Sequence, residues 1–542
     1  MSNQPLLWWR HGVVYQIYPR SFMDSNGDGI GDLRGITKKM DYLSNTLGID
    51  AIWLSPFYKS PMDDFGYDVA DYCDVDPIFG TLADFDALIT AAHAQNLKVI
   101  VDFVPNHSSD QHQWFIESRS SRDNPKRDWY TWRDAKPDGS PPNNWLAVFG
   151  GSAWEWDEKT QQYYLHSFLP SQPDLNWRNP EVKAAMFEAM RFWMRRGVDG
   201  FRVDVAHYLM KDPDLRDNPL VDAVILAENT KSLGGYDSQQ HLYDKGHSDN
   251  HELYRQFRGV LDEFEAISPR YSVGEIHIFD WEEWATYYGA GDELHMPFNF
   301  GLIYAKWKAN VVRDVVESVE RVLTKPGQWP NYVFSNHDEH RISSRYGADA
   351  ARSIMMVLLT LRGTPTMYYG DELGMKDVSI PPEKVQDPWE LRVPGANLGR
   401  DPERTPMQWD ATPNAGFSPA GVETWLPIGE DYSTVNVEAE LQDARSMLNM
   451  TRALLRLRRG SEALLNGSYR TAVGTPEEVY AYVREASSER YLILINFAAD
   501  ERTVSLPELA SGQVVISTLM DRADKTGGSL KLRPNEGCVV RF

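Results

Sequence analysis

The sequence predicts an α/β fold: a closed (β/α)8 TIM barrel, with a small domain inserted after the third strand and an all-β sandwich at the C-terminal end. Three observations predict it. Apolar, β-branched runs recur up to about residue 369, helical patterns separate most of them, and short alternating runs follow from about residue 466. Strands that alternate with helices in this way favour parallel pairing.

The barrel strands are predicted by apolar runs at regular intervals. Helical patterns such as Leu82–Gln95, Pro180–Arg196 and Ala350–Leu361 separate them. Eight strand–helix units suggest a closed barrel. The eight runs are Val13–Pro19, Ala51–Pro56, Leu97–Pro105, Gly200–Ala206, Tyr271–Ile276, His295–Phe300, Tyr332–Asp338 and Thr364–Tyr369.

Three gaps between runs are too long for plain connections. Residues 106–176 are rich in Asp, Pro, Trp and Gly and predict the inserted domain. Residues 207–268 predict an enlarged loop after the fourth strand, and residues 374–433 a loop-rich excursion after the eighth. The barrel is therefore expected to comprise residues 1–105 and 177–465.

The C-terminal part begins after a last barrel helix, Arg445–Arg459, which Gly460 is expected to end. Residues 466–542 then read as a small all-β sandwich. Its clearest strands are Tyr480–Arg484, Tyr491–Asn496 and Gln513–Ser517.

Composition and charge exclude several classes of function. The formal net charge of −23 disfavours nucleic acid and anionic membranes as partners, although solubility alone could explain it. Cys73 and Cys538 make neither a disulfide framework nor a zinc motif. Because the sequence lacks a signal-peptide pattern and an 18-residue apolar run, we expect a cytoplasmic protein, monomeric or homodimeric, that acts on a small molecule.

Three strand ends carry a carboxylate. They are Gly200-Phe-Arg-Val-Asp-Val-Ala206, Val273-Gly-Glu-Ile276 and Ser335-Asn-His-Asp338. Because barrel strands deliver residues to one mouth, Asp204, Glu275 and Asp338 should surround one pocket. Two carboxylates that flank a bond, assisted by a third, are suited to glycoside cleavage.

The chain resembles glycoside hydrolases of the α-amylase family, in the α-glucosidase and oligo-1,6-glucosidase branch. The resemblance runs from Tyr15-Gln-Ile-Tyr-Pro19 to Arg533-Pro-Asn-Glu-Gly537, and Gln172-Pro-Asp-Leu-Asn176 matches the motif that marks the oligo-1,6-glucosidase branch. The four strand-end motifs of the family match Asp102-Phe-Val-Pro-Asn-His107, Gly200–Ala206, Val273–Ile276 and Phe334-Ser-Asn-His-Asp338.

The resemblance implies a role for each carboxylate. Asp204 would be the nucleophile, kept charged by Arg202 on the same side of the strand. Glu275 would be the general acid and then the base, with its pKa raised by an apolar strand, and Asp338 would bind sugar hydroxyls. The resemblance thus implies a covalent intermediate and a retained α configuration. Taken singly, these residues could be a buried ion pair, a solvent-facing Glu and a turn cap.

Further residues are implied to bind the sugar. Asp64 would grip the hydroxyls of the terminal glucose and Tyr67 would stack under its ring. His107 and His337 would contact the same sugar, although a lone His is more often structural, and their spacing suggests no zinc site.

The resemblance also implies that an arginine closes the pocket. Arg404 would pair with Asp64, with Arg400 in the same motif as the competing candidate. A closed pocket implies cleavage from the non-reducing end. Three aromatic residues lie in regions that line the second sugar's site in relatives, although core packing is an alternative for each: Phe149, Phe168 and Phe298.

Asp24-Ser-Asn-Gly-Asp-Gly-Ile-Gly-Asp32 follows a calcium-loop pattern. Position 12 of the loop is Gly35 and not Glu, so the motif is not a full EF-hand. We expect a structural Ca²⁺ or Mg²⁺, which the family carries here; the alternative is an Asx-rich turn. The expected ligands are Asp24, Asn26, Asp28, the Ile30 carbonyl and Asp32.

The residue after the nucleophile tracks linkage in the family: Val accompanies α-1,6 activity, and Ala or Thr accompanies α-1,4. Val205 therefore favours α-1,6 substrates, with maltose, sucrose or trehalose as further possibilities. One rival is a glucosyltransferase or isomerase on the same fold that makes trehalose or a rearranged sucrose. The other is a non-catalytic partner of a transporter, which the three retained acids and the lack of a membrane helix disfavour.

Overall fold

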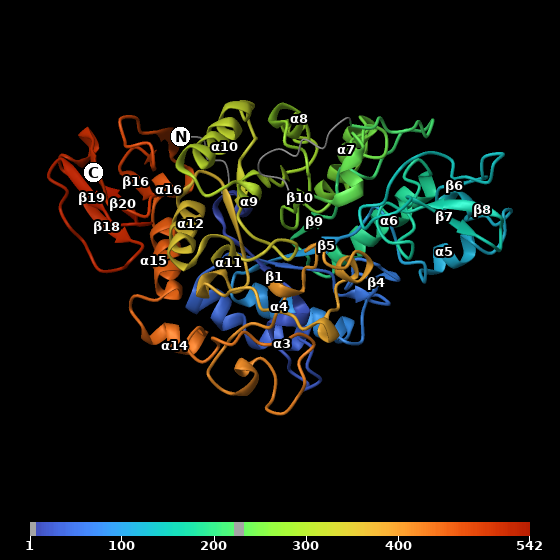
Figure 1. Cartoon of the computed structure of the whole chain (residues 1–542), viewed down its shortest axis with the longest axis horizontal. Coiled ribbons are helices and arrows are strands. Elements are labelled where there is room, and N and C mark those ends of the chain that lie inside the picture. The colour runs from blue at the N-terminus through green and yellow to red at the C-terminus, as the bar shows by residue number, and fades with distance from the viewer. Residues whose placement is uncertain (1–6, 222–231) are drawn as a thin grey trace.

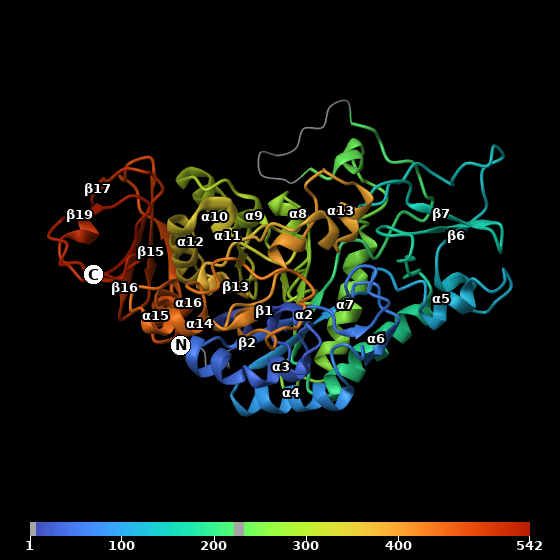
Figure 2. The same cartoon turned by 60° about the horizontal axis from the view of Figure 1, so that its bottom comes forward.

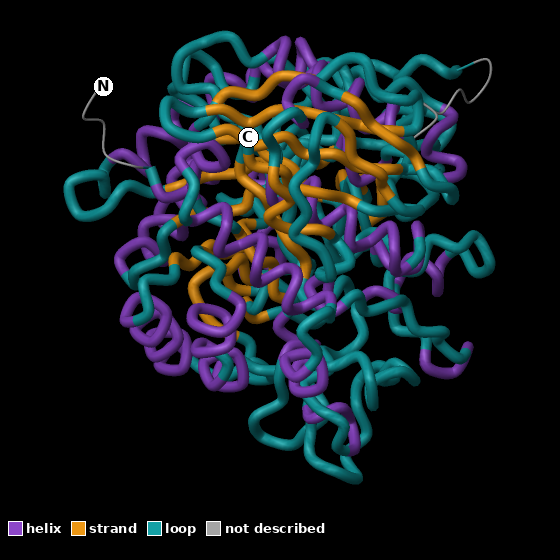
Figure 3. The backbone as a smooth tube through the Cα atoms, turned by 90° about the vertical axis from the view of Figure 1, so that its left-hand side faces the viewer, coloured by secondary structure: helices purple, strands orange, loops and turns teal. Residues whose placement is uncertain are grey.

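The computed structural model describes residues 7–221 and 232–542. Eight parallel strands form one sheet in the order β11-β10-β9-β5-β2-β1-β13-β12, and this arrangement confirms the predicted barrel. Figure 3 views the molecule from the side of the C-terminal sheets, with helices in purple and strands in orange. Several of these strands are buried along their whole length, as expected of parallel strands covered on both faces. The strands are β1 (Val14–Ile17), β2 (Ala51–Leu54), β5 (Lys98–Phe103), β9 (Gly200–Val203), β10 (Tyr271–Gly274), β11 (Met296–Pro297), β12 (Asn331–Val333) and β13 (Thr364–Tyr368).

Helices cover the outside of the barrel (Figures 1 and 2). The sequence signals for their starts are present: Thr81 and Asp84 form a capping box for α4, and Asn179 caps α6 ahead of a proline at its first turn. The longer helices are α4 (Leu82–Ala94), α6 (Pro180–Arg195), α7 (Asp249–Asp262), α10 (Ala309–Val322), α12 (Ala348–Thr360) and α15 (Met447–Arg459).

Shorter helices lie at strand ends and in the connections. They are α1 (Trp8–His11), α2 (Pro19–Phe22), α3 (Leu33–Lys38), α5 (Gln113–Ser118), α8 (Trp281–Thr286), α9 (Gly301–Tyr304), α11 (Ile342–Tyr346), α13 (Pro388–Arg392), α14 (Val437–Gln442) and α16 (Glu462–Asn466).

The barrel closes between β11 and β12 through a side chain. No backbone ladder joins these two described strands. Instead, the amide of Asn331 donates to the Pro297 carbonyl at 2.7 Å and accepts from the Asn299 N–H at 3.0 Å. The expected strand over His295–Phe300 is therefore too long, because Pro297 has no N–H for a ladder.

Residues between β5 and α6 hold a separate small sheet, at the right of Figure 1. Its strands are antiparallel in the order β6-β8-β7, with bounds Trp132–Arg133, Gln162–Leu165 and Trp154–Asp157. A second antiparallel pair, β3 (Tyr58–Lys59) and β4 (Asp71–Val75), follows β2. Both lie in segments that follow a barrel strand, β5 and β2 respectively.

The C-terminal residues form antiparallel sheets, at the left of Figure 1. Arg484 of this part donates to the Thr360 carbonyl of α12 at 2.7 Å, which joins the two parts through a buried guanidinium. The larger sheet has the order β14-β15-β16-β20-β18, and β17 pairs with β19. The bounds are β14 Ser468–Thr471, β15 Val479–Glu485, β16 Arg490–Asn496, β17 Arg502–Ser505, β18 Gln513–Ser517, β19 Ser529–Leu532 and β20 Gly537–Arg541.

Within the described residues, none of the helices combines the length and apolar character needed to cross a membrane. Cys73 and Cys538 are both free thiols, one half-buried and one buried.

Candidate active site

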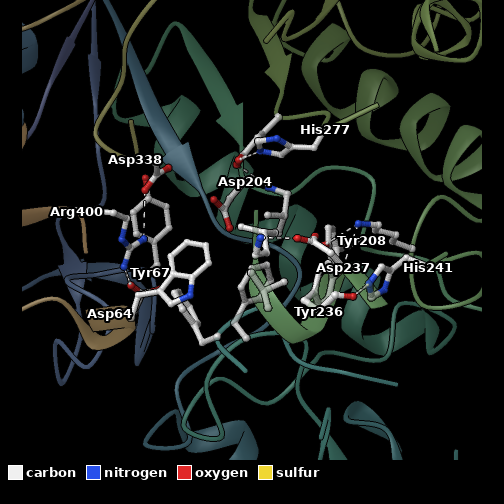
Figure 4. A pocket seen from close by; sticks show the side chains of 18 of the residues that line it. Asp64, Tyr67, Asp204, Tyr208, Tyr236, Asp237, His241, His277, Asp338 and Arg400 are labelled. Atoms are coloured by element: carbon white, nitrogen blue, oxygen red, sulfur yellow. Dashed lines mark hydrogen bonds and ion pairs between the residues drawn. The ribbon is translucent and has the colours of Figure 1, made fainter. Parts of the chain in front are cut away.

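The ends of β9, β10 and β12 bring Asp204, Glu275 and Asp338 to the wall of one cavity of about 420 Å³. Figure 4 shows Asp204 near its centre, with Asp64, Asp338 and Arg400 on one side of it. The side chains expected at the mouth of the barrel are therefore gathered there, as the strand-end positions predict.

Arg202 connects three carboxylates beneath the cavity. Its guanidinium lies 2.8 Å from Asp102, 2.7 Å from Asp204 and 2.5 Å from Glu275. Asp102 and Arg202 are register partners on β5 and β9, so their side chains meet inside the barrel. Sequence reasoning quoted Asp102 in a motif but gave it no role, because strand register was not readable.

Three carboxylates around one guanidinium cannot all ionise easily, because like charges repel one another. Burial raises the pKa of Asp204 well above its ordinary value, and it raises that of Asp102 to about 6 in spite of Arg202. Burial acts on Glu275 too, but attraction to Arg202 and the bond to His277 outweigh it and lower its pKa.

The lowered pKa of Glu275 corrects the sequence-based expectation, which was a raised one. A charged Asp204 and a Glu275 with a raised pKa were expected, because Arg202 was assigned to Asp204 alone. The arginine in fact lies closer to Glu275 than to Asp204. Arg202 and His277 therefore lower the pKa of Glu275, whereas burial raises that of Asp204.

Val205 has an unusual backbone. Its φ is +36°, which is a genuine outlier for a β-branched residue. The conformation aims the Val205 N–H at Glu275 Oε2, at a distance of 3.1 Å. Such strain persists where the surrounding structure requires it. Here it accompanies the Val205 N–H, which is a second donor, besides Arg202, to Oε2 of Glu275.

Asp64 lies in the wall of the cavity and pairs with Arg400. Arg400 is 2.9 Å from Asp64 and 3.2 Å from Asp338. The expected pair of Asp64 with Arg404 is wrong. Arg404 instead donates to the His337 carbonyl at 2.7 Å and to Asp338 at 3.0 Å, and these two contacts turn its guanidinium away from Asp64.

Asp338 stays ionised. Burial opposes its charge, but the guanidinium groups of Arg400 and Arg404, 3.2 and 3.0 Å away, hold its pKa far below the ordinary value. Its side chain is still 29% exposed to the cavity. A charged acceptor in this place can take hydrogen bonds from a polyol.

Tyr67, His107 and His337 form a connected group next to Asp102. The Tyr67 hydroxyl lies 2.6 Å from His337 Nε2 and 3.1 Å from Asp102, and the Tyr67 and His337 rings are parallel. His107 contacts the Tyr67 carbonyl at 3.0 Å. Burial lowers the pKa of His107 to about 4 and that of His337 to about 3, so both are neutral at pH 7.

Two of the three expected aromatic residues line the cavity. Phe149 and Phe168 do so, with their rings 6.0 Å apart. Phe298 is not part of the lining, which corrects that expectation. It packs between Trp53 and Phe300, so it belongs to the aromatic core behind the site.

Sequence reasoning missed the wall of the cavity opposite Asp64, on the right of Figure 4. The Tyr208 and Tyr236 hydroxyls are 2.7 Å apart, and the Lys245 ammonium lies 3.3 and 3.2 Å from them. His241 stacks on Tyr236 at 3.6 Å. These residues come from the long stretch after β9, whose path gave no sequence signal.

The Asp24–Asp32 loop has the oxygen donors that Ca²⁺ or Mg²⁺ prefers. Asp24 accepts from the Gly27 and Gly29 N–H groups, and Asp28 accepts from the Ile30 N–H. Asp32 fits less well, because it already bonds Ser25 and caps α3 through the Gly35 N–H.

A different group of possible ligands stands out within residues 7–221 and 232–542. His340, Asp377 and Glu403 are the one set of three His, Cys, Asp or Glu side chains whose ligand atoms all lie within 4.8 Å of one another. His340 Nδ1 is 3.0 Å from Asp377 and 3.4 Å from Glu403. These bonds raise the pKa of His340 to about 10, so a protonated histidine accounts for the group.

The sequence matches a known protein family over most of its length. A family model described as the α-amylase catalytic domain matches residues 16–467. The chain belongs to the α-amylase family. The resemblance read from the strand-end motifs is thus confirmed, and the match spans every barrel strand from β2 to β13.

Within the α-amylase family, several relatives are similar along nearly their whole length. A probable α-glucosidase of Rhizobium meliloti (strain 1021) is 44% identical, with 96% of this chain and 95% of the relative covered. An oligo-1,6-glucosidase of Heyndrickxia coagulans is 39% identical, with 98% and 99% covered. The crystal structure of an α-glucosyl transfer enzyme, XgtA, superposes with a TM-score of 0.91 at 41% identity, with 98% and 99% covered.

Proposed function

We propose that this protein is a retaining, exo-acting α-glucosidase that releases glucose from the non-reducing end of short α-glucosides. The observation that carries the proposal is a group of ion pairs at one side of the cavity. There Arg400 pairs with Asp64 and Asp338, and Asp204 and Glu275 line the same cavity. The names of the full-length relatives support the same substrate class.

The chemistry follows from the residues at the strand ends. Asp204 attacks the anomeric carbon and forms a glucosyl ester, while Glu275 protonates the glycosidic oxygen. Glu275 then takes a proton from water, which hydrolyses the ester. Asp338 binds sugar hydroxyls, and these bonds strengthen as positive charge develops on the ring.

The reaction needs a charged Asp204 and a proton on Glu275, the reverse of the direction in which the two pKa values are shifted in the free protein. Arg202 contacts both carboxylates, so it can stabilise whichever of them is charged. When a sugar enters, Asp204 has to be ionised and Glu275 has to gain a proton.

The pocket supports removal of one sugar at a time. Asp64, held by Arg400 and by Gln172 at 3.1 Å, presents a buried carboxylate to hydroxyls of the terminal glucose. An internal glucose of a polymer would require space beyond this ion pair. Short substrates with a free non-reducing end are therefore favoured.

The second sugar would lie toward Val205, Phe149 and the Tyr208–Tyr236 wall. We propose a preference for α-1,6 links, with α-1,4 links also cleaved. The alternative is a glucosyltransferase or isomerase on the same fold. The similarity to a transfer enzyme supports it, and so does the aromatic wall, which could hold a sugar acceptor in place of water.

The experiment that tests the proposal follows products by proton NMR from the first minute. The substrates are maltose, isomaltose, trehalose and sucrose at equal concentration. We expect early α-glucose from the wild type and none from Asp204→Asn, because the carboxamide cannot attack. New disaccharides with little free glucose would favour the transferase, and no turnover of any substrate would overturn the proposal.

Three accompanying features are also proposals. Asp24, Asn26, Asp28 and the Ile30 carbonyl, with Asp32 as the fifth expected ligand, would hold a structural Ca²⁺ or Mg²⁺. Two free thiols fit the reducing environment of the cytoplasm. We also propose a monomer or homodimer, which sedimentation would distinguish.

A further inference from the structure

His277 is a group in the cavity wall that neither the sequence motifs nor the proposed mechanism uses. Its Nε2 lies 2.7 Å from Glu275 Oε1. Its ring stacks on Phe300 at 4.6 Å with an interplanar angle of 17°, which fixes the direction of the nitrogen. The side chain is 34% exposed, so solvent reaches the ring.

The two oxygens of Glu275 have different surroundings. Oε2 lies 2.5 Å from the Arg202 guanidinium and 3.1 Å from the Val205 N–H. Both groups are donors, so Oε2 is held as an acceptor and is a poor place for a proton. The proton that an acid catalyst needs must therefore reside on Oε1, the oxygen beside His277.

We propose that His277 supplies the proton that Glu275 delivers to the leaving group. The inference rests on the proposed function. The step starts from the imidazolium form of His277, with protons on both Nδ1 and Nε2, whose Nε2–H bonds the Glu275 carboxylate at Oε1. When a glucoside binds, the Nε2–H bond breaks, an Oε1–H bond forms, and a neutral imidazole with Nδ1–H remains. Glu275 then passes that proton to the glycosidic oxygen as the C–O bond breaks.

The second half of the reaction restores the pair. Water gives its proton to Oε1 as its oxygen attacks the glucosyl ester, and the proton returns to His277 Nε2. No proton is gained or lost over the cycle. His277 acts through Glu275, so it is a positioning and proton-exchange residue rather than a catalytic one.

The other titratable groups that face His277 do not compete for this proton. His207, on the segment after β9, has its ring centre 6.1 Å away, and Tyr304 on α9 has its ring centre 6.5 Å away. Burial holds the pKa of His207 far below its ordinary value and that of Tyr304 far above, so both are neutral near pH 7. Of these groups, Glu275 is the one that can exchange the proton with His277.

Two variants separate the hydrogen bond that His277 makes to Glu275 from its ability to carry a proton. His277→Gln keeps an N–H donor for Oε1 but cannot carry a proton, and His277→Phe keeps the ring that stacks on Phe300 but loses the bond. Each is compared with wild type on isomaltose and on p-nitrophenyl α-glucoside, and thermal melting by circular dichroism checks the fold.

We expect both variants to lose roughly 100-fold in kcat/KM on isomaltose, the low end of general acid catalysis. On the nitrophenyl substrate the loss should be a few-fold at most, because a good leaving group needs little protonation. The basic limb of the kcat/KM profile on isomaltose should move to lower pH in His277→Gln, because Arg202 still favours an ionised Glu275.

Equal losses on the two substrates in both variants, or an unmoved basic limb, would overturn the role of His277 while the α-glucosidase function stands. If the wild type cleaves neither substrate, and Glu275→Gln shows the same lack of activity, the proposed function and this role are both overturned.

Discussion

Arg202 determines the charge balance of the site at the scale of single residues. It is buried and contacts three carboxylates from three neighbouring strands. Removal of such a cation leaves uncompensated buried charge, which typically costs about 3–5 kcal/mol. The same contacts hold Asp204 and Glu275 on one guanidinium. A nucleophile and acid pair needs this arrangement, because one of the two carboxylates must be charged while the other carries a proton.

Val205 allows the linkage preference to be tested without changing the backbone. Val205→Thr keeps a β-branched side chain at the same strained φ of +36°, so it exchanges one methyl group for a hydroxyl. We expect the ratio of kcat/KM on isomaltose to that on maltose to fall about tenfold, since one buried group discriminates by ~1–3 kcal/mol. An unchanged ratio would remove Val205 from the account of linkage.

The sequence could not decide which of the two arginines in the Gly399–Trp409 motif pairs with Asp64. The motif correctly placed an arginine beside Asp64, but both candidates have the same chemistry and lie four residues apart. The choice is made by a short turn, η6 (Asp401–Glu403), which separates them. Arg400 precedes the turn and reaches Asp64, whereas Arg404 follows it and reaches the His337 carbonyl.

At the scale of elements, loops that follow different strands are joined by the His340 group. His340 follows β12, whereas Asp377 and Glu403 follow β13, and all three meet in one ion cluster. Asp377 also accepts from the Arg341 N–H at 2.8 Å. The cluster thus holds the loop of Arg400 and Arg404 against the loop of Asp338.

This cluster predicts a pH dependence of stability. The folded pKa of His340, about 10, lies above its ordinary value of 6.5. Its contribution should therefore be complete below about pH 6.5 and be lost as the pH rises through 10. Because the His340 side chain is 41% exposed, solvent screening will keep the effect small.

The measurement is urea unfolding of wild type and His340→Gln from pH 6 to 10.5. The difference in unfolding free energy should shrink toward high pH. A difference that is constant or that grows would contradict the ion cluster. Asp377→Asn should show the same trend, because it removes the other half of the pair.

The barrel elements were predictable because buried parallel strands read as continuous apolar runs. The ends of the strands were less predictable: the predicted run Leu97–Pro105 continues with Val104 and Pro105, yet β5 stops at Phe103. Apolar residues continue past the end of the strand, where the chain turns toward the pocket. The end of the strand is set by the hydrogen-bonding register with its neighbours, which the sequence alone does not reveal. The wall built from Tyr208, Tyr236 and Lys245 depends on tertiary contacts alone, so no local pattern pointed to it.

At the scale of the whole molecule, the C-terminal sheets lie at one end and the small sheet of β6, β7 and β8 lies at the other (Figure 1). The C-terminal sheets contact α12 through Arg484 and through the Tyr482 hydroxyl, which bonds Thr360 at 2.5 Å. The cavity is lined by residues between Asp64 and Arg400. The C-terminal part therefore supports the barrel without touching the substrate.

The Asp24–Asp32 loop supports the molecule from another side. Asp24 donates its N–H to the Phe417 carbonyl at 3.0 Å and accepts from the Ser418 hydroxyl at 2.7 Å. Gly29 lies so close to this segment that a Cβ there would stand 2.0 Å from the Glu423 carbonyl oxygen. The loop therefore joins residues near the N-terminus to those after the motif of Arg400 and Arg404.

An ion in this loop should stabilise the whole fold by linkage. A cation that binds the folded state alone adds about 2.7 kcal/mol at 100 times its dissociation constant. We therefore expect EDTA to lower the melting temperature, CaCl₂ or MgCl₂ to restore it, and Asp28→Asn to abolish this response. The loop's carboxylates are not part of the catalytic cavity, so activity measured well below the melting temperature should change little. If chelation alters neither melting temperature nor activity, the loop is an Asx-rich turn that binds no stabilising ion, and its contacts with Phe417 and Ser418 are sufficient to hold it.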